Sequence, residues 1–205
     1  QDVRLDGVGY GLTLGSDNVA DYQGPMRHHG SLVGPVANRI GGARAQVGGK
    51  ECRFPANQAD RHTLHSGGAG TQFKLWKIAS ASETRLVLTL DLPDGEGGFP
   101  GNRHVTAEWQ IEAPATLRLT VTTTTDAETI VNFTNHSYCN LDGSAEWAGH
   151  TLRIAADHVT EVDEDLIPTG RLLAVTDTDL DLRQGRSISP QSPSLDTNFC
   201  LSDAP

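Results

Sequence analysis

The sequence is poor in positive charge and in long apolar runs. Its 205 residues include 16 Lys and Arg against 26 Asp and Glu, which gives a formal net charge of −10. An acidic surface repels phosphate groups, and this argues against a nucleic-acid partner. No run approaches the roughly 18 apolar residues of a membrane-spanning helix, so we expect no membrane partner. The acidic balance is compatible with a neutral small-molecule substrate.

Cysteine is also scarce, and its pattern is uninformative for metal binding. The three cysteines, Cys52, Cys139 and Cys200, lie far apart in the sequence and lack CxxC spacing. An odd number without metal spacing favours small buried thiols in a reducing compartment. We therefore expect a cytoplasmic location and no metal site.

Helical patterns are nearly absent, whereas turn residues are abundant. The 22 glycines and 10 prolines separate short segments. These segments are rich in β-branched residues, and apolar and polar residues alternate along them. These segments are residues 85–92, 103–111, 116–125 and 130–138, with weaker ones at 151–162 and 171–182. Only residues 16–22 look helical, with Ser16 as a candidate N-cap. The pattern predicts one all-β domain over residues 1–205, an antiparallel β-sandwich or a related architecture with very little helix.

One strand-like segment is unusually polar. Residues 132–143 read NFTNHSYCNLDG and place His136 among amide and hydroxyl side chains. A buried polar group costs free energy unless it is hydrogen-bonded, so these groups either satisfy one another or face a polar ligand. A histidine held by such neighbours can donate or accept a proton near neutral pH.

Three further segments carry candidate ligand-binding residues. GPVANRIGG at 34–42 places Asn38 and Arg39 between apolar residues, and a guanidinium suits sugar hydroxyls or a carboxylate. RHTLHSGG at 61–68 offers His62 and His65 before a glycine pair. SLDTNF at 194–199 contributes Asp196. Each also has an ordinary structural interpretation, because Arg39 could anchor a turn, either histidine could be structural and Asp196 could be a turn residue.

Several catalytic classes lack their motifs. The eight histidines include no HExxH and no Cys/His zinc pattern. No GxSxG elbow supplies a hydrolytic nucleophile, and GGARAQVGG lacks the lysine of a phosphate-binding loop. Two classes of function remain after these exclusions. One is proton-transfer chemistry on a polyhydroxylated ligand, and the other is binding of such a ligand.

The motifs, taken in order, resemble the aldose 1-epimerase (galactose mutarotase) family. The resemblance rests on six segments that cover nearly the whole chain: GPVANRIGGARAQVGGKECRFPAN, HTLHSGG, DGEGGFPGN, NFTNHSYCNLDG, VDEDLIPTG and SLDTNFCL. It implies a large two-sheet β-sandwich that binds an aldose. It also implies interconversion of the α and β anomers of a free sugar of galactose or glucose type, without a cofactor.

The resemblance assigns roles to individual residues. His136 matches the general acid that protonates the ring oxygen, and His65 matches a second active-site histidine that hydrogen-bonds the sugar. Arg39 and Asp196 match groups that bind hydroxyls, with Asn38 beside the arginine. By adjacency alone, Asn135 and Ser137 are expected to support His136.

The sequence departs from the family pattern at several positions. Pro35 stands where arginine is frequent, Ser66 precedes the glycine pair, and Cys139 replaces an aromatic residue. The glutamate base of the family has no counterpart, because it lies beyond the match to Asp196. We therefore expect the chain to be part of a longer protein, truncated at both ends, and impaired when taken alone.

Other functions stay open on the sequence alone. A non-catalytic carbohydrate-binding protein of the same fold would keep Arg39, His65 and Asp196 without the base. A purely structural sandwich would leave Arg39, His65 and His136 scattered. Within enzymes, the substrate could be another aldose or a phosphorylated one. The preferred sugar and the oligomeric state are not specified.

Overall fold

The computed structural model describes residues 3–5, 8–190 and 195–202. The chain divides into two compact units, Ser31–His136 and the pair of segments Gln1–Gly30 and Ser137–Pro205. Each unit is described separately below. The expectation of a single domain over residues 1–205 stays a prediction.

The unit Ser31–His136 is built almost entirely from antiparallel strands. Its elements are β3 (Leu32–Val33), β4 (Arg39–Ile40), the 3-10 turn η2 (Gly41–Ala43), β5 (Arg44–Val47), β6 (Lys50–Arg53), β7 (Thr63–Leu64), η3 (Gly67–Ala69), η4 (Thr71–Phe73), β8 (Lys77–Ala81), β9 (Arg85–Leu92), η5 (Glu96–Gly98), β10 (Arg103–Glu112), β11 (Thr116–Thr125) and β12 (Thr134–Asn135).

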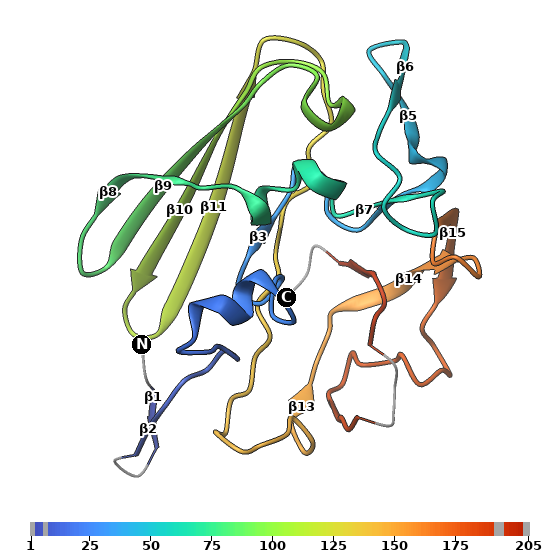
Figure 1. Ribbon diagram of the computed structural model, residues 1–205. Helices are drawn as coiled ribbons and strands as arrows, with labels where there is room; N and C mark the ends of the chain where they lie inside the picture. Colours follow the sequence, from blue (N-terminus) through green and yellow to red (C-terminus); the bar gives the residue numbers. More distant parts are fainter. Residues whose placement is uncertain (1–2, 6–7, 191–194, 203–205) are drawn as a thin grey trace. The chain divides into compact units, whose positions relative to one another are not determined.

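The largest sheet of this unit has the order β11-β10-β9-β8, and Figure 1 shows its strands side by side. The register pairs Val105 with Leu90 and Ala107 with Leu88, so alternate residues form one apolar face. The opposite face is mainly polar, with the buried Val87 as an exception, and it carries the Arg85–Glu108 ion pair at 2.8 Å. Alternation in the sequence thus determined both the strands and the face that each buries.

Two apolar clusters stabilise the unit. Val36, Phe54 and Phe99 form the first, and Leu90, Leu92 and Val105 form the second, which also contacts Phe133. A Cβ on Gly34 would lie 2.1 Å from the Phe133 ring, so the chain must have glycine there. The contact fixes the turn after β3 against the segment that leads into β12.

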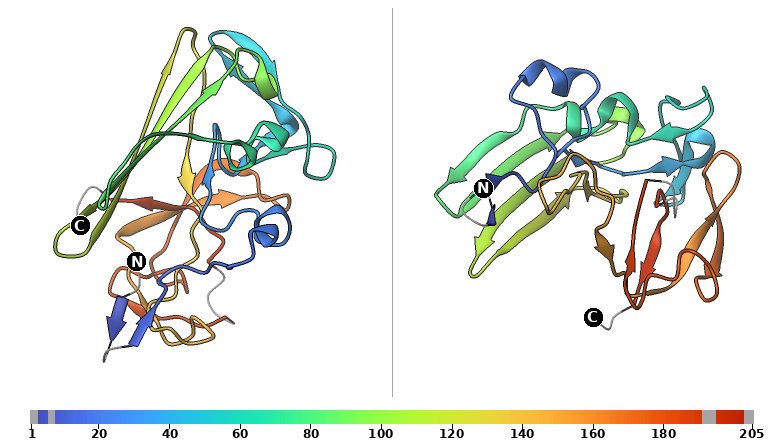
Figure 2. Two further views of the ribbon diagram at one scale, coloured as in Figure 1. Left: turned by 60° about the vertical axis from the view of Figure 1, so that its left-hand side comes forward. Right: turned by 90° about the horizontal axis from the view of Figure 1, so that it is seen from below.

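The second unit combines the two ends of the described chain. Its elements are β1 (Val3–Leu5), β2 (Val8–Tyr10), η1 (Val19–Gln23), β13 (Thr151–Leu152), β14 (Ala156–Val162), β15 (Pro168–Ala174), β16 (Arg186–Ser187) and β17 (Phe199–Leu201). The last of these pairs with β14 to give the order β15-β14-β17, and Figure 2 shows this sheet in two further views.

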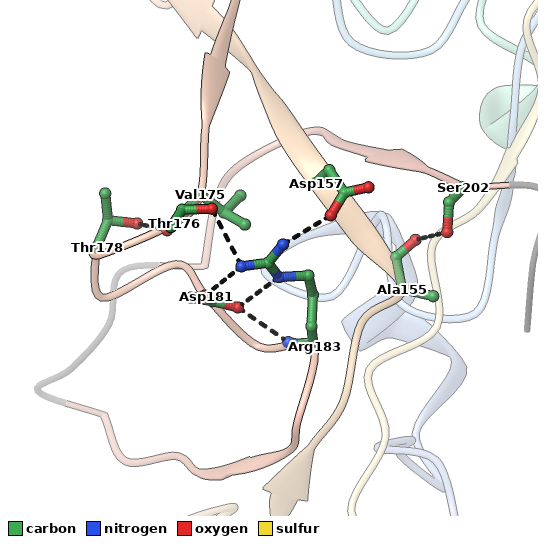
Figure 3. A network of polar contacts seen from close by, with 8 residues as sticks. All are labelled: Ala155, Asp157, Val175, Thr176, Thr178, Asp181, Arg183 and Ser202. Carbon is green, nitrogen blue, oxygen red and sulfur yellow. Dashed lines mark hydrogen bonds and ion pairs between the residues drawn. The ribbon is translucent and has the colours of Figure 1, made fainter.

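Arg183 organises the loop that follows β15. Its guanidinium donates to Asp157 at 2.7 Å, to Asp181 at 2.6 Å and to Thr176 at 3.1 Å, as Figure 3 shows. These bonds connect β14 with an acidic loop. Hydrogen bonds from Arg183 hold the pKa of Asp181 below its usual value.

The all-β prediction is confirmed, but several local predictions were wrong. None of the three cysteines is buried, since Cys139 is exposed and Cys52 and Cys200 are intermediate. The strand expected over 171–182 ends at Ala174. The longest helix in the described ranges is the five-residue 3-10 helix Val19–Gln23, and its N-cap is Asn18 rather than Ser16. Ser16 instead donates to the Asp21 carboxylate at 2.5 Å. Residues 130–138 contain only the two-residue strand β12, because Asn132 forms a parallel bridge with Val36. Within the described residues, no helix has the length and apolar character needed to cross a membrane.

Candidate functional site

Pairing of β4 with β7 places Asn38 and Arg39 beside His65. Arg39 lies opposite Leu64 in the register, so the residues just outside the pair, Asn38 and His65, also face each other. The backbone N–H of His65 donates to the Asn38 carbonyl at 2.8 Å. In return, the Asn38 N–H donates to Nδ1 of the His65 imidazole at 3.1 Å.

This second bond determines the proton position on His65. Because Nδ1 accepts the Asn38 N–H, the proton of the neutral imidazole lies on Nε2, which is then a hydrogen-bond donor. Asn38 and His65 both have left-handed backbone conformations, with φ of 60° and 52°. Such conformations are unfavourable for most non-glycine residues and concentrate at functional sites.

Ser66, which departs from the family pattern, has a structural role next to His65. Its side chain is fully buried, and its hydroxyl donates to the Val36 carbonyl and accepts the Val36 N–H, each at 2.9 Å. Ser66 also has a left-handed backbone with φ of 61°. The hydroxyl therefore satisfies both polar groups of a buried backbone segment four residues before Ile40.

His136 approaches from the strand pair β3–β12. Thr134 lies opposite Val33 and Asn135 opposite Leu32, and the His136 N–H donates to the Ser31 carbonyl at 2.9 Å. The two imidazoles of His65 and His136 meet edge to face, with ring centroids 5.4 Å apart and planes inclined by 78°. Histidines 71 positions apart in sequence are thus neighbours.

Arg39 completes the cluster with two neutral partners. Its Nε donates to Oε1 of Gln58 at 2.9 Å, and its Nη1 donates to Oδ1 of Asn38 at 3.0 Å. Gln58 carried no recognisable signal in the sequence, since a glutamine in a loop has no characteristic spacing. The sequence reasoning therefore missed it.

The two histidines of RHTLHSGG have different environments. His62 is buried with 6% exposure, and its ring nitrogens lie 3.0 Å from the Gly42 N–H and 2.9 Å from Nε of Arg61. Its backbone pairs with Gln58 in both directions. His62 thus supports the loop, whereas His65 is half-buried and lies against His136.

The glycine-rich hairpin at 94–102 packs behind the His65 loop. A Cβ on Gly97 would lie 2.3 Å from that of Ala69, and Lys74 forms an ion pair with Glu96. Arg103, 2% exposed, donates to the Gly101 and Pro93 carbonyls at 3.0 and 2.6 Å. Burial lowers the pKa of Arg103, and the charges of Glu96 and Asp94 oppose this shift. The hairpin is therefore a support for the site.

Four of the five predicted site residues, Asn38, Arg39, His65 and His136, lie in the unit Ser31–His136 and form one cluster. Asp196 lies in the other unit, in an exposed segment before β17. Its part in the site stays a prediction. In the described ranges, His, Cys, Asp and Glu side chains form no group of three that could hold a metal ion.

The cluster combines proton-transfer and hydroxyl-binding groups. Imidazoles can donate or accept protons near neutral pH, and the guanidinium supplies directional donors for oxygen atoms. His65 presents a donor at Nε2 because its Nδ1 is occupied. The arrangement therefore suits a small ligand rich in hydroxyl groups.

Comparison with known proteins gives a consistent result. The family model for aldose 1-epimerase matches residues 4–204. Galactose mutarotase from Mus musculus is 35% identical over 206 residues, which covers 94% of this chain and 58% of the mouse protein. Aldose 1-epimerase from Escherichia coli K12 is 32% identical over 179 residues, covering 87% of this chain and 51% of that protein.

Solved structures agree with these sequence relationships. An aldose epimerase homologue from C. elegans superposes with a TM-score of 0.88 at 28% identity, covering 96% of this chain and 62% of that one. Galactose 1-epimerase from Lactobacillus acidophilus NCFM gives a TM-score of 0.77 at 28% identity, over 92% of this chain and 56% of that one. The chain shares their β-sandwich fold and spans a little over half of their length.

Proposed function

Because this chain belongs to the aldose 1-epimerase family, we propose that its protein interconverts the α and β anomers of a free aldose of galactose or glucose type. One observation carries the proposal more than any other. The His65 and His136 imidazoles lie edge to face with centroids 5.4 Å apart, and Arg39 is held beside them through Asn38. A purely structural sandwich would have no reason to gather these groups.

The proposed reaction consists of proton transfers. A base takes the proton of the anomeric hydroxyl while an acid protonates the ring oxygen, so the bond between the anomeric carbon and the ring oxygen breaks and a carbonyl forms. Rotation about the neighbouring carbon–carbon bond exposes the other face. Reclosure then returns both protons and gives the opposite anomer. Each matched acid or base contributes roughly 10²–10⁴-fold, and no step requires a redox cofactor.

We assign the acid role to His136 and a donor role to His65. The Nε2–H of His65, fixed by the bond from Asn38 to Nδ1, would hydrogen-bond an oxygen of the sugar near the reacting carbon. Arg39, Asn38 and Asp196 would bind hydroxyl groups. The base, a glutamate in the family resemblance, is not assigned to any residue of this chain.

We further propose a cytoplasmic location and a small sugar substrate, with no nucleic-acid or membrane partner. The odd number of widely spaced cysteines supports a reducing compartment. The net charge of −10 supports a neutral ligand in preference to nucleic acid.

Polarimetry tests the proposed activity directly. The rotation of freshly dissolved α-D-galactose is followed with and without the intact protein that contains these 205 residues, and we expect that protein to accelerate the approach to equilibrium. His136→Asn should abolish the acceleration while galactose binding, measured by calorimetry, persists. The matched control is His104→Asn, because His104 is an exposed histidine of β10 paired with Asp91.

The outcomes separate the alternatives. Acceleration that survives His136→Asn would remove the acid role of His136. Galactose binding without any acceleration by the unsubstituted intact protein would contradict epimerase activity and favour carbohydrate binding. Absence of both would contradict the proposal entirely.

A further inference from the structure

Gln58 forms a side-chain hydrogen bond with Arg39 that no sequence motif predicted. Its Oε1 accepts the Nε–H of Arg39 at 2.9 Å. We propose that Gln58 is a positioning residue, which orients the guanidinium of Arg39 so that its remaining N–H groups face the sugar. This inference rests on the proposed function, because it concerns how the same site binds its ligand.

The loop around Gln58 holds its side chain in a defined place. Gln58 and His62 exchange two backbone hydrogen bonds, at 3.0 and 3.1 Å, and the His62 carbonyl also accepts the Asn57 N–H at 3.0 Å. Asn57 in turn pairs with the backbone of Leu64 through both atoms of its amide, at 2.7 and 3.0 Å. Leu64 lies opposite Arg39 in the β4–β7 register. The acceptor and the residue that it orients are therefore anchored to the same short sheet.

The two hydrogen bonds of the Arg39 guanidinium leave the N–H groups of Nη2 for a ligand. Gln58 takes Nε–H and Asn38 takes one hydrogen of Nη1. In the described part of the chain, Arg39 forms no other side-chain bond. A guanidinium has five N–H donors in a rigid plane, so fixing two of them fixes the direction of the others, which include both hydrogens of Nη2.

The neutral character of the two partners distinguishes Arg39 from six other arginines of this chain. A carboxylate pairs with the guanidinium of several others at 2.6 to 2.9 Å, namely Arg53, Arg85, Arg118, Arg171, Arg183 and Arg186. A bidentate carboxylate occupies two N–H groups along one edge and neutralises the charge. An amide oxygen accepts one bond and leaves the charge intact. Gln58 therefore orients Arg39 but leaves its positive charge and its other N–H groups to bind a ligand oxygen.

Two substitutions of Gln58 and one control separate orientation from folding. Gln58→Leu removes the acceptor at similar size, whereas Gln58→Glu keeps an oxygen at the same place. Gln46→Leu is the matched control, because Gln46 is an exposed glutamine of β5. All three are made in the intact protein that contains these 205 residues.

Kinetics provide the first readout. We expect Gln58→Leu to raise KM for α-D-galactose roughly fivefold to tenfold, which is the effect of losing one typical hydrogen bond. Its kcat should change less than about twofold, because uniform binding is lost and no transition-state interaction is removed. Gln58→Glu should also raise KM, because its carboxylate neutralises the guanidinium charge, and Gln46→Leu should leave both constants unchanged.

A second readout is independent of sugar. The Nε–H of Arg39 gives a resonance in a proton–nitrogen correlation spectrum, which is assigned by its absence in Arg39→Lys. A hydrogen-bonded Nε–H exchanges slowly with water, so we expect the resonance to be protected in the unsubstituted protein and in Gln58→Glu. It should exchange rapidly in Gln58→Leu and remain protected in Gln46→Leu.

The two readouts distinguish failure of the inference from failure of the proposed function. Equal exchange of the Arg39 Nε–H in Gln58→Leu and in the unsubstituted chain would overturn the positioning role. So would a loss in kcat at unchanged KM, or a KM in Gln58→Glu equal to that of the unsubstituted protein. A protected Nε–H in a chain that neither binds nor converts galactose would overturn the proposed function, and with it any role of Gln58 toward a sugar.

Discussion

The Nδ1 atom of His65 accepts the backbone N–H of Asn38 at 3.1 Å. This bond links a residue after β7 to a residue before β4 and leaves Nε2 as the protonated nitrogen of the neutral ring. The edge-to-face contact of His65 with His136, at a centroid distance of 5.4 Å, makes the orientation of one ring depend on the other. A backbone amide thus sets the chemical character of a side chain in the candidate site.

Substitution of His65 can separate its structural bond from its proposed donor. Asparagine has an oxygen close to the place of Nδ1 and tolerates the left-handed backbone at φ 52°, but it has no counterpart of Nε2. We expect His65→Asn to keep its free energy of unfolding within about 0.5 kcal/mol of the unsubstituted protein. Epimerase activity should fall by roughly tenfold or more. Urea unfolding and polarimetry measure the two effects.

His65→Gln serves as the counterpart to that variant. Glutamine carries an amide nitrogen near the place of Nε2 but does not accept the Asn38 N–H in the same way. It should therefore retain more activity than His65→Asn. Equal activity of the two variants would contradict the donor role of Nε2.

Ser66 should contribute to stability through its hydroxyl. The side chain is fully buried and satisfies both backbone groups of Val36 at 2.9 Å. Ser66→Ala leaves these groups unpaired and should lower the free energy of unfolding by about 2–3 kcal/mol. Ser66→Gly should lower it less, because glycine relieves the strain of the left-handed backbone, worth about 1 kcal/mol. Urea unfolding that ranks alanine above glycine in stability would contradict this account.

Gly98 is required by its surroundings and not merely by its backbone angle. A Cβ at Gly98 would lie 1.9 Å from the Arg53 carbonyl oxygen, and φ is +83°. Gly98→Ala should therefore destabilise the protein by about 4 kcal/mol or prevent folding. Gly95 is the matched control, with φ of +77° and no atom within 4 Å of the added Cβ. Gly95→Ala should cost only about 1–2 kcal/mol, and thermal or urea unfolding compares the two.

Asp181 should make the second unit sensitive to acid. Its pKa lies below the ordinary value of 3.8 because Arg183 donates hydrogen bonds to it, and Figure 3 shows this contact. A carboxyl whose pKa is lowered by folding stabilises the native state at pH values above the unfolded pKa. That stabilisation is lost as the pH falls through the lower, folded value.

The acid dependence can be measured by comparing Asp181→Asn with the unsubstituted protein. Unfolding midpoints in urea between pH 6 and pH 2.5 should fall less steeply below about pH 4 in Asp181→Asn. Glu164→Gln is the control, since Glu164 is exposed and its carboxylate has no partner among the residues that the structure describes. An identical slope in Asp181→Asn and the unsubstituted chain would exclude a stabilising role of the Asp181–Arg183 pair.

The long strands were predictable because their cause is local. Residues 85–92 and 116–125 form β9 and β11 with those bounds, since alternation specifies both strand and buried face. Residues 130–138 also look strand-like, although they are more polar, but they form only the short strand β12. The parallel bridge between Asn132 and Val36 replaces the regular ladder there, and no local pattern encodes a partner so far away in sequence.

The sequence by itself determined the all-β class and, through its ordered motifs, the aldose 1-epimerase family and the candidate residues Asn38, Arg39, His65, His136 and Asp196. Tertiary structure alone decided which of two nearby histidines lies against His136. The His62 ring accepts a hydrogen bond from the Gly42 N–H and so supports its loop. The His65 ring lies edge to face with the His136 ring. It also revealed Gln58 as the partner of Arg39. The physical reason is that a hydrogen bond depends on the positions and directions of its donor and acceptor. For groups far apart in the sequence, these are fixed only when the segments that carry them pack together.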